Sequence, residues 1–129
     1  MDHSAYEKLY RELIQVIPEI KGAYDKERQW WGKEVPGPHI IFGDVLTPHL
    51  ITLLEVHTDH EQLKRIFNFL EELSGREQWV QEVVQMSVCE RLGDKKDWLA
   101  AAHYYMGNKT KRLCKEIEKF WGRENPGRF

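Results

Sequence analysis

Residues 59–75, DHEQLKRIFNFLEELSG, describe one amphipathic helix with both of its ends marked. Asp59 followed by Gln62 forms a capping box, in which the aspartate accepts a hydrogen bond from the backbone at the start of the helix. Apolar residues then recur every three or four positions and so share one face: Leu63, Ile66, Phe67, Leu70 and Leu73. Ser74-Gly75 ends the helix. The stretch therefore predicts a helix that buries one side in a core.

The same periodicity extends in both directions along the chain. Ser4 and Glu7 form a second capping box, and Pro18, which cannot continue a helix, begins the next one. Residues 32–38, GKEVPGP, predict a loop, and residues 39–42 predict a short extended segment. The remaining helices are expected to begin at Thr47-Pro48, with a buried side of Leu50, Ile51, Leu54 and His57, then near Trp79, at Trp98 and at Asn108. The last one has an expected inner face of Leu113, Cys114, Ile117, Phe120 and Trp121.

These helices and their short connections predict an all-α fold. Short loops make consecutive helices pack as antiparallel neighbours. We expect six to seven helices, stacked as hairpins in a short solenoid-like (HEAT/armadillo-like) array or gathered in an irregular bundle. An offset of 34 residues aligns Trp79, Val83 and Met86 with Leu113, Ile117 and Phe120, which favours the array. The expected organisation is a single domain over 1–129, with N-terminal helices in 1–36, the hairpin array in 37–122 and a tail in 123–129.

Composition indicates a soluble protein that works in the cytoplasm. The 129 residues are 41% apolar and 31% charged, and the longest apolar runs are far shorter than the ~20 residues that span a bilayer. The N-terminus is polar and acidic and does not resemble a secretory signal. We therefore expect Cys89 and Cys114 to be reduced, buried thiols, and we expect no membrane contact.

Charge is divided unevenly along the chain. Residues 1–64 carry 11 acidic and seven basic side chains, net −4, whereas residues 65–129 carry ten and 12, net +2. Most of the basic excess lies in residues 109–123, which end with Arg123 and contain a basic stripe on the last helix: Lys109, Lys111, Arg112, Lys115 and Lys119. The whole chain, with 19 basic and 21 acidic residues, is too balanced for a dedicated nucleic-acid binder. Glu116 and Glu118 also interrupt the stripe.

No motif in the sequence predicts catalysis or a metal site. His57, Asp59 and His60, with His49 upstream, resemble a ligand cluster, but a helix ends at His57 and another begins at Asp59, so their side chains diverge. Ser87 lies on an apolar stripe, where a small residue permits close packing, and Cys89, Cys114 and His103 lack metal-ligand spacing. Glu71 and Glu90 could approach each other across two helices, where a glutamate pairs with a cation or caps a helix more often than it catalyses. We expect no catalytic residue, cofactor or metal.

Two pairs of adjacent aromatic residues point instead to binding. Neighbouring helical residues cannot both face a core, so one member of Trp30-Trp31 and one of Tyr104-Tyr105 is expected at the surface. Exposed tryptophan and tyrosine anchor protein interfaces. The alternative for Trp30 and Trp31 is that both fold over the end of the bundle.

The C-terminal half resembles a set of small, uncharacterised, all-helical bacterial proteins. Their pattern F-L-E-x-L, then V-x-x-V-V-x-x-S-V-x-E-x-L-G-D, then Y-M-G-x-x-T-x-x-L-x-x-E-I-E falls here on residues 69–73, 80–94 and 105–118. The resemblance covers about residues 37–119, and Asn108 replaces a proline of the pattern. Such proteins occur among immunity proteins of polymorphic-toxin systems, so the resemblance implies a binding module without catalytic residues.

The leading hypothesis is therefore a non-catalytic protein-binding domain, an immunity protein that neutralises a cognate toxin. The residues expected to contact the partner are Trp30, Trp31, Glu71, Glu90, Asp94 and Tyr104. The first alternative is nucleic-acid association through Lys109, Lys111, Arg112, Lys115 and Lys119. The second is a metal- or carboxylate-dependent enzyme. The sequence leaves the partner and the oligomeric state open.

Overall fold

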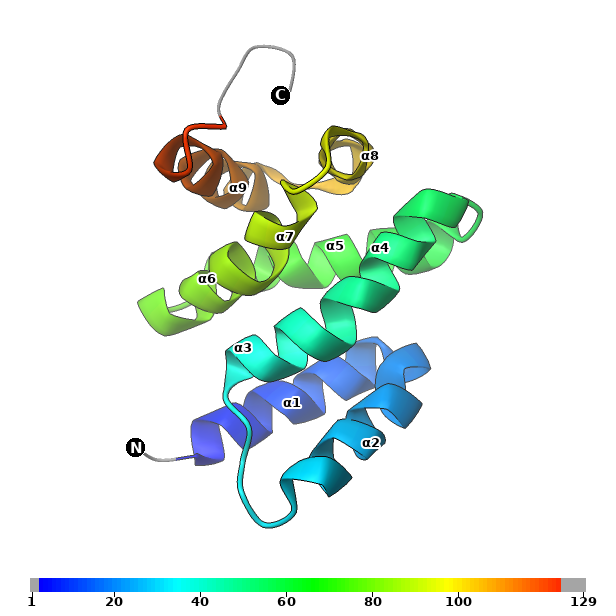
Figure 1. The fold of residues 1–129 in the computed structure, drawn as a ribbon, viewed down its shortest axis with the longest axis vertical. Coiled ribbons are helices and arrows are strands. Elements are labelled where there is room, and N and C mark those ends of the chain that lie inside the picture. Colours follow the sequence, from blue (N-terminus) through cyan, green and yellow to red (C-terminus); the bar gives the residue numbers. More distant parts are fainter. Residues whose placement is uncertain (1–2, 124–129) are drawn as a thin grey trace.

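The computed structural model describes residues 3–123, and every regular element in that range is helical (Figure 1). The chain begins with α1 (Ser4–Val16), a 3₁₀ turn η1 (Pro18–Ile20) and α2 (Lys21–Trp31), which together form a hairpin at one end of the molecule. Pro18 occupies the first position of η1, as its ring predicts. The all-α prediction is confirmed, whereas the expected tail lies mostly in 124–129, outside the described residues.

One long helix, Pro38–Val56, crosses the middle of the fold and replaces two elements expected from the sequence. It consists of α3 (Pro38–Ile40), the π-helical segment η2 (Ile41–Leu46) and α4 (Thr47–Val56). The extended segment predicted at 39–42 is wrong, because a short apolar run fits a buried helix as well as a strand. Thr47 does not begin a helix either. A proline inside a helix removes one hydrogen bond and crowds the preceding turn, and the wider π turn lies just before Pro48.

The rest of the chain packs against this helix from the other side. α5 (His60–Ser74) is followed by a second interrupted helix, composed of α6 (Gln78–Val84), the π-helical segment η3 (Gln85–Cys89) and α7 (Glu90–Leu92). The chain then forms α8 (Lys96–Tyr105) and α9 (Asn108–Phe120) at the end opposite to α2. α9 packs on α5, α6 and η3, while α8 packs on α4, α5 and α7.

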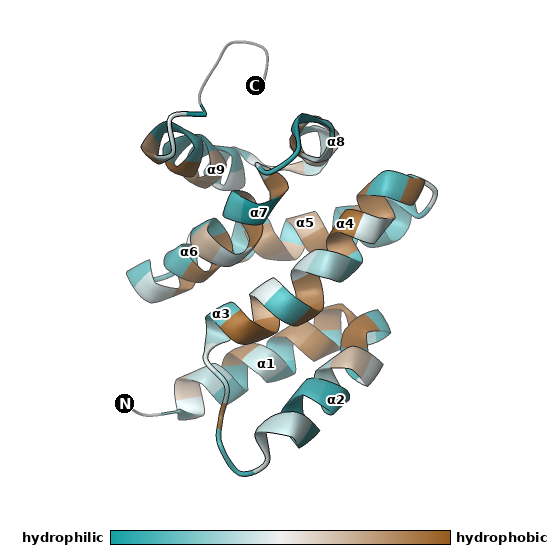
Figure 2. Cartoon of the chain, in the orientation of Figure 1, coloured by the Kyte–Doolittle hydropathy of each residue, from teal (hydrophilic) through white to brown (hydrophobic). Residues whose placement is uncertain are grey.

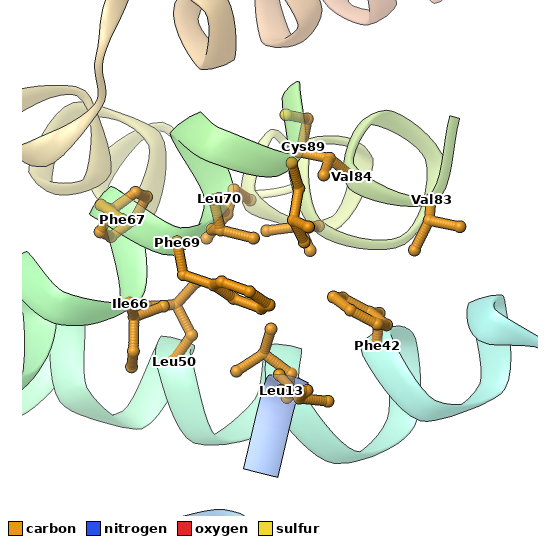
Figure 3. Close-up of a cluster of buried hydrophobic side chains, with 14 of the residues drawn as sticks. Leu13, Phe42, Leu50, Ile66, Phe67, Phe69, Leu70, Val83, Val84 and Cys89 are labelled. Carbon is orange, nitrogen blue, oxygen red and sulfur yellow. The ribbon is translucent and has the colours of Figure 1, made fainter. Parts of the chain in front are cut away.

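A single continuous core joins these elements. Side chains from α1, η2, α4, α5, α6 and η3 converge in it, including Leu13, Phe42, Leu50, Phe67 and Val84, each with no exposed surface (Figure 3). In Figure 2 most helices carry both apolar and polar residues, whereas α2 is largely polar and has no buried residue. Pro38–Val56 is the one helix among the described residues that is long and apolar enough to cross a bilayer, a test that buried helices of soluble proteins also pass. Val56 is 60% exposed, whereas six apolar side chains of this helix are part of the core: Ile41, Phe42, Val45, Leu46, Leu50 and Leu54.

Bidentate arginine–glutamate contacts fasten the N-terminal hairpin. Arg65 on α5 binds Glu19, with Nη–Oε distances of 2.8 and 2.9 Å, and Arg76 binds Glu12 on α1 at 2.8 and 3.0 Å. Arg28 on α2 binds Glu7 on α1 at 2.6 and 2.9 Å. The hydrogen bond from each arginine is the main cause that lowers the pKa of its glutamate. The Ser4–Glu7 capping box is therefore not formed: Ser4 is the first residue of α1, and Glu7 binds Arg28 instead.

At the other end of the molecule, two expectations for α9 are also wrong. Phe120 is 74% exposed and Trp121 51% exposed, because the helix ends at Phe120 and its last turn extends past the core. Asn108 is the first helical residue and not the cap, since Glu71 of α5 reaches the free amides at that end. Met86 is also exposed, at 41%, so two of the six positions aligned by the offset of 34 lie outside the core.

Cys89 in η3 and Cys114 in α9 are joined in a disulfide, with their Cα atoms 4.9 Å apart. Both are fully buried, as expected, but the prediction that they are reduced is wrong. The two residues are 25 positions apart in the chain, and only the packing of α9 on η3 brings them together. The bridge fastens the last helix to the second π-helical segment.

Candidate protein-binding surface

Trp30 and Trp31 line an open groove between α2 and the long central helix. We call it the tryptophan groove; its volume is about 570 Å³, and its lining residues are Ala23, Lys26, Glu27, Trp30, Trp31, Ile40, Asp44 and Val45. The α2 residues follow the i, i+3, i+4, i+7, i+8 spacing of one helix face. No residue of α2 is fully buried, so this helix keeps a wide surface for contact.

The two tryptophans differ in exposure, as expected for adjacent residues of a helix. Trp30 is 80% exposed, while Trp31 is half-buried and donates its indole N–H to Glu27 at 2.8 Å. Their rings meet edge to face with centroids 5.6 Å apart. The hydrogen bond to Glu27 fixes the orientation of the Trp31 ring, and this ring in turn packs against the exposed ring of Trp30. The alternative that both tryptophans belong to the core is wrong for Trp30.

The opposite wall of the groove is positioned by contacts between the two π-helical segments. Thr47, the first residue of α4 after η2, shares its hydroxyl proton between the carbonyls of Phe42, at 2.8 Å, and Ser87 in η3, at 2.9 Å. Arg91 donates to the carbonyl of Gly43 and pairs with Asp44 at 3.0 Å. A π turn leaves backbone carbonyls without their usual helical partners, and here side chains at the interface of the two interrupted helices supply donors.

Ser87 has a polar role that the apolar pattern did not predict. Its hydroxyl lies 2.8 Å from Nδ1 of His39, and only 3% of Ser87 is exposed. The sequence signal was weak, since a serine on an apolar stripe reads as a packing residue. The pair helps to hold η3 against α3, which carries Ile40 of the groove wall.

The three acidic residues expected at a binding surface all lie near α9; the side chain of Glu71 binds the start of this helix, and that of Asp94 binds Arg123, just beyond its end. Glu71 accepts the backbone N–H of Lys109 at 3.1 Å and of Thr110 at 2.9 Å, and the Thr110 hydroxyl at 2.9 Å. Burial raises the pKa of Glu71, but these hydrogen bonds outweigh it and lower the pKa overall. Asp94 accepts from Arg123 at 3.1 Å, and the backbone carbonyl of Glu90 accepts from the same arginine at 3.3 Å. Glu71 and Glu90 therefore lie at opposite ends of α9 and do not meet.

The second aromatic pair belongs to a separate surface. Tyr104 is 80% exposed, and its ring meets that of Tyr105 edge to face at 5.0 Å. The Tyr105 hydroxyl lies 2.5 Å from Nδ1 of His60, and the rings of His60 and His57 are 5.1 Å apart. His57 ends α4 in the left-handed conformation, φ 58°, and is exposed, not buried as expected. Since α8 and α2 lie at opposite ends of the fold, Tyr104 and Trp30 do not share one surface (Figure 1).

Three further expectations concern the cap of α5, a metal site and the basic stripe. Asp59 caps α5 as expected, since its side chain accepts from the backbone of Gln62 at 3.1 Å, while the Gln62 amide donates to the same carboxylate at 2.9 Å and not to the backbone of Asp59 as a full capping box requires. Within residues 3–123 no three His, Cys, Asp or Glu side chains are grouped closely enough to hold a metal ion. The basic stripe follows α9, where four of its residues are exposed and Lys111 is half-buried.

The fold and these surfaces define the class of protein: an all-α domain with an exposed aromatic groove at one end. The chain belongs to the family described as domain of unknown function DUF7674, whose model matches residues 10–122. No curated protein matches the chain. No solved structure matches it either.

Proposed function

We propose that this chain is a non-catalytic protein-binding domain, and that its partner occupies the tryptophan groove. The observation that carries the proposal is the 80% exposure of Trp30 beside a groove of about 570 Å³. Tryptophan is among the residues that contribute most to interfaces, since its large ring fills a pocket and excludes water. A partner that covers Trp30 also covers Ile40 and Val45 on the facing helix.

Charge indicates what kind of partner fits this end of the molecule. Residues 1–64, which contain the whole groove, carry a net charge of −4. The charged residues that line the groove are Lys26, Glu27 and Asp44, of which Asp44 pairs with Arg91. The loop that follows α2 presents the exposed Lys33 and Glu34. The partner is therefore a protein that places an apolar side chain against Trp30 and surrounds it with lysine or arginine, since opposite potentials speed association and favour the correct partner.

The finer proposal is an immunity protein that binds and neutralises a toxin in the cytoplasm of a bacterium. It is supported by the resemblance of residues 37–119 to small helical proteins found among immunity proteins. Helix α2, which builds one wall of the groove, lies outside that resemblance but inside the family match of residues 10–122.

The test compares two equally exposed aromatic residues at opposite ends of the fold. Trp30→Ala and Tyr104→Ala each remove a ring that is 80% exposed, so neither is expected to lower the melting temperature appreciably. Each variant, and the unmodified chain, is immobilised and exposed to lysate of the host that encodes it, and bound proteins are quantified by mass spectrometry.

We expect a protein with a toxin domain to bind the unmodified chain and Tyr104→Ala, and to bind Trp30→Ala at least about 30-fold more weakly, the equivalent of a 2 kcal/mol hot spot. Co-expression of the same toxin domain should then stop growth with Trp30→Ala and permit it with Tyr104→Ala. A partner that is lost with Tyr104→Ala and kept by Trp30→Ala would place the interface on α8 and overturn the proposal. A bound partner that is not toxic would overturn the immunity role alone.

A further inference from the structure

We propose that α9 carries a second binding site, for single-stranded nucleic acid, formed by the basic stripe and the exposed rings of Phe120 and Trp121. This site is at the other end of the molecule from the tryptophan groove and does not depend on the proposed function. Phosphates of the strand would lie along the stripe, and unpaired bases would stack on the two rings.

The cations of the stripe share one solvent face. Arg112, Lys115 and Lys119 follow an i, i+3, i+7 spacing and are all exposed. They span about 10 Å of helix at 1.5 Å per residue, which is the length of about three nucleotides at 3.4 Å each. Lys115 and Lys119 make no ion pair within the part of the chain that the structure describes. Arg28, Arg65 and Arg76, by contrast, are all bound to glutamates.

The two glutamates that interrupt the stripe in the sequence are both engaged within the fold. Glu118 is fully buried, and Nη2 of Arg123 lies 2.6 Å from its carboxylate, so it does not face a ligand on the outer side of the helix. Glu116 lies 3.3 Å from the side-chain amide of Gln85 and 3.9 Å from Arg112. On the folded surface the objection that acidic residues break the stripe no longer applies to Glu118, and it applies only to Glu116, which is exposed beside Arg112.

The aromatic rings lie at the end of the same helix. Phe120 is 74% exposed and Trp121 51% exposed, and their centroids are 5.2 Å apart with the rings nearly perpendicular. Proteins that bind single strands combine a positive surface with such rings, because every base has a face that can stack on them. A duplex would not offer those faces.

A membrane surface is the competing partner, and the packing of α9 argues against it. Helices that lie in a membrane interface bury an apolar face among the lipids. The apolar face of α9 is already covered, since Leu113, Cys114 and Ile117 are at most 4% exposed. Only the two rings at its end would remain to insert, so a strand with unpaired bases fits this surface better.

The experiment measures fluorescence anisotropy of labelled oligouridylate and oligothymidylate of about 15 nucleotides, at about 50 and 200 mM salt. The chain is compared with Lys115→Gln/Lys119→Gln and with Phe120→Ala. A matched control, Lys33→Gln/Lys64→Gln, removes two exposed lysines elsewhere. Thermal melts confirm that each variant is folded, and vesicles rich in phosphatidylglycerol are tested in parallel.

With three phosphates neutralised, binding should weaken about 20-fold between the two salt concentrations, and only about threefold for the α9 double variant. Phe120→Ala should weaken binding about fivefold or more at both concentrations and leave the salt dependence unchanged. The control should match the unmodified chain. No binding at low salt, equal losses in control and α9 variants, or binding to vesicles but to neither oligonucleotide would each overturn the proposal.

Discussion

Replacement of Glu71 by alanine tests how the last helix is held. Its carboxylate accepts three hydrogen bonds, from the backbone of Lys109 and from the backbone and hydroxyl of Thr110, at 2.9 to 3.1 Å. Loss of a helix cap costs about 1 kcal/mol. Thr110 is only 1% exposed, so its hydroxyl would also lose its charged partner and keep only the hydroxyl of Ser74 at 3.2 Å, at a further cost of about 1–2 kcal/mol. We expect a total destabilisation of about 2–3 kcal/mol.

The assay is thermal unfolding followed by circular dichroism. An unfolding entropy of about 2.1 cal/mol/K per residue converts this loss into a fall of about 7–11 °C in the melting temperature. Glu72→Ala is the matched control, because Glu72 is the adjacent residue of α5 and makes only an exposed contact with Arg76 at 2.6 Å. Exposed pairs of this kind contribute about 0.3–0.5 kcal/mol. A Glu71→Ala variant that melts within a degree or two of Glu72→Ala would refute the capping argument.

Three further predictions concern acid, reduction and one strained residue. The pKa values of four glutamates, Glu7, Glu12, Glu19 and Glu71, are lowered in the folded chain. Their contribution to stability is therefore complete above about pH 4.5 and is lost as the pH falls through the folded-state pKa values. The urea midpoint of unfolding should be lower at about pH 3 than at about pH 7, and equal midpoints would contradict this. Reduction of the Cys89–Cys114 bridge, whose ends are 25 positions apart, should destabilise the fold by up to about 3.5 kcal/mol. A phosphine reductant should therefore lower the melting temperature, and two thiols should become titratable after unfolding. An unchanged melting temperature would show that the bridge adds no stability. His57→Gly should be more stable than His57→Ala by about 1 kcal/mol in urea unfolding, because both remove the ring but only glycine adopts φ 58° without strain, and the reverse order would show that this conformation is not retained.

Local signals in the sequence were sufficient for most helix ends. Pro18 begins a turn, Asp59 caps α5 and Gly107 follows α8 because each of these residues acts on its own neighbours. The central helix was divided wrongly because Thr47-Pro48 carries a strong start signal. In the folded chain the Thr47 hydroxyl does not cap a helix. It donates to the carbonyls of Phe42 in η2 and of Ser87 in the distant π-helical segment η3, so the helix continues through Thr47.

Surface residues were harder to assign than helix ends. Helix geometry predicted that one residue of each aromatic pair is exposed, and the structure shows which one it is: Trp30 in the first pair and Tyr104 in the second. Periodicity alone placed Phe120 in the core, because it shows which residues share a face but not where the neighbouring helix ends. The Cys89–Cys114 bridge and the binding of Glu71 at α9 depend on contacts between distant segments, which no local pattern records.

The two π-helical segments also constrain how this chain can change in length. A π turn holds one residue more than an α turn, and each residue turns a helix by about 100°. Deletion of one residue within Ile41–Leu46 would therefore let the turn close into regular α geometry, and the residues on both sides would keep their faces. Deletion of one residue at the start of α4 would instead rotate the residues before it by about 100° relative to Leu50 and Leu54, so that Ile41 and Phe42 would leave the core and Gly43 would turn away from Arg91. Relatives that keep this fold should therefore gain or lose residues in the 32–37 loop, or lose one within a π-helical segment, and not between residues 47 and 56.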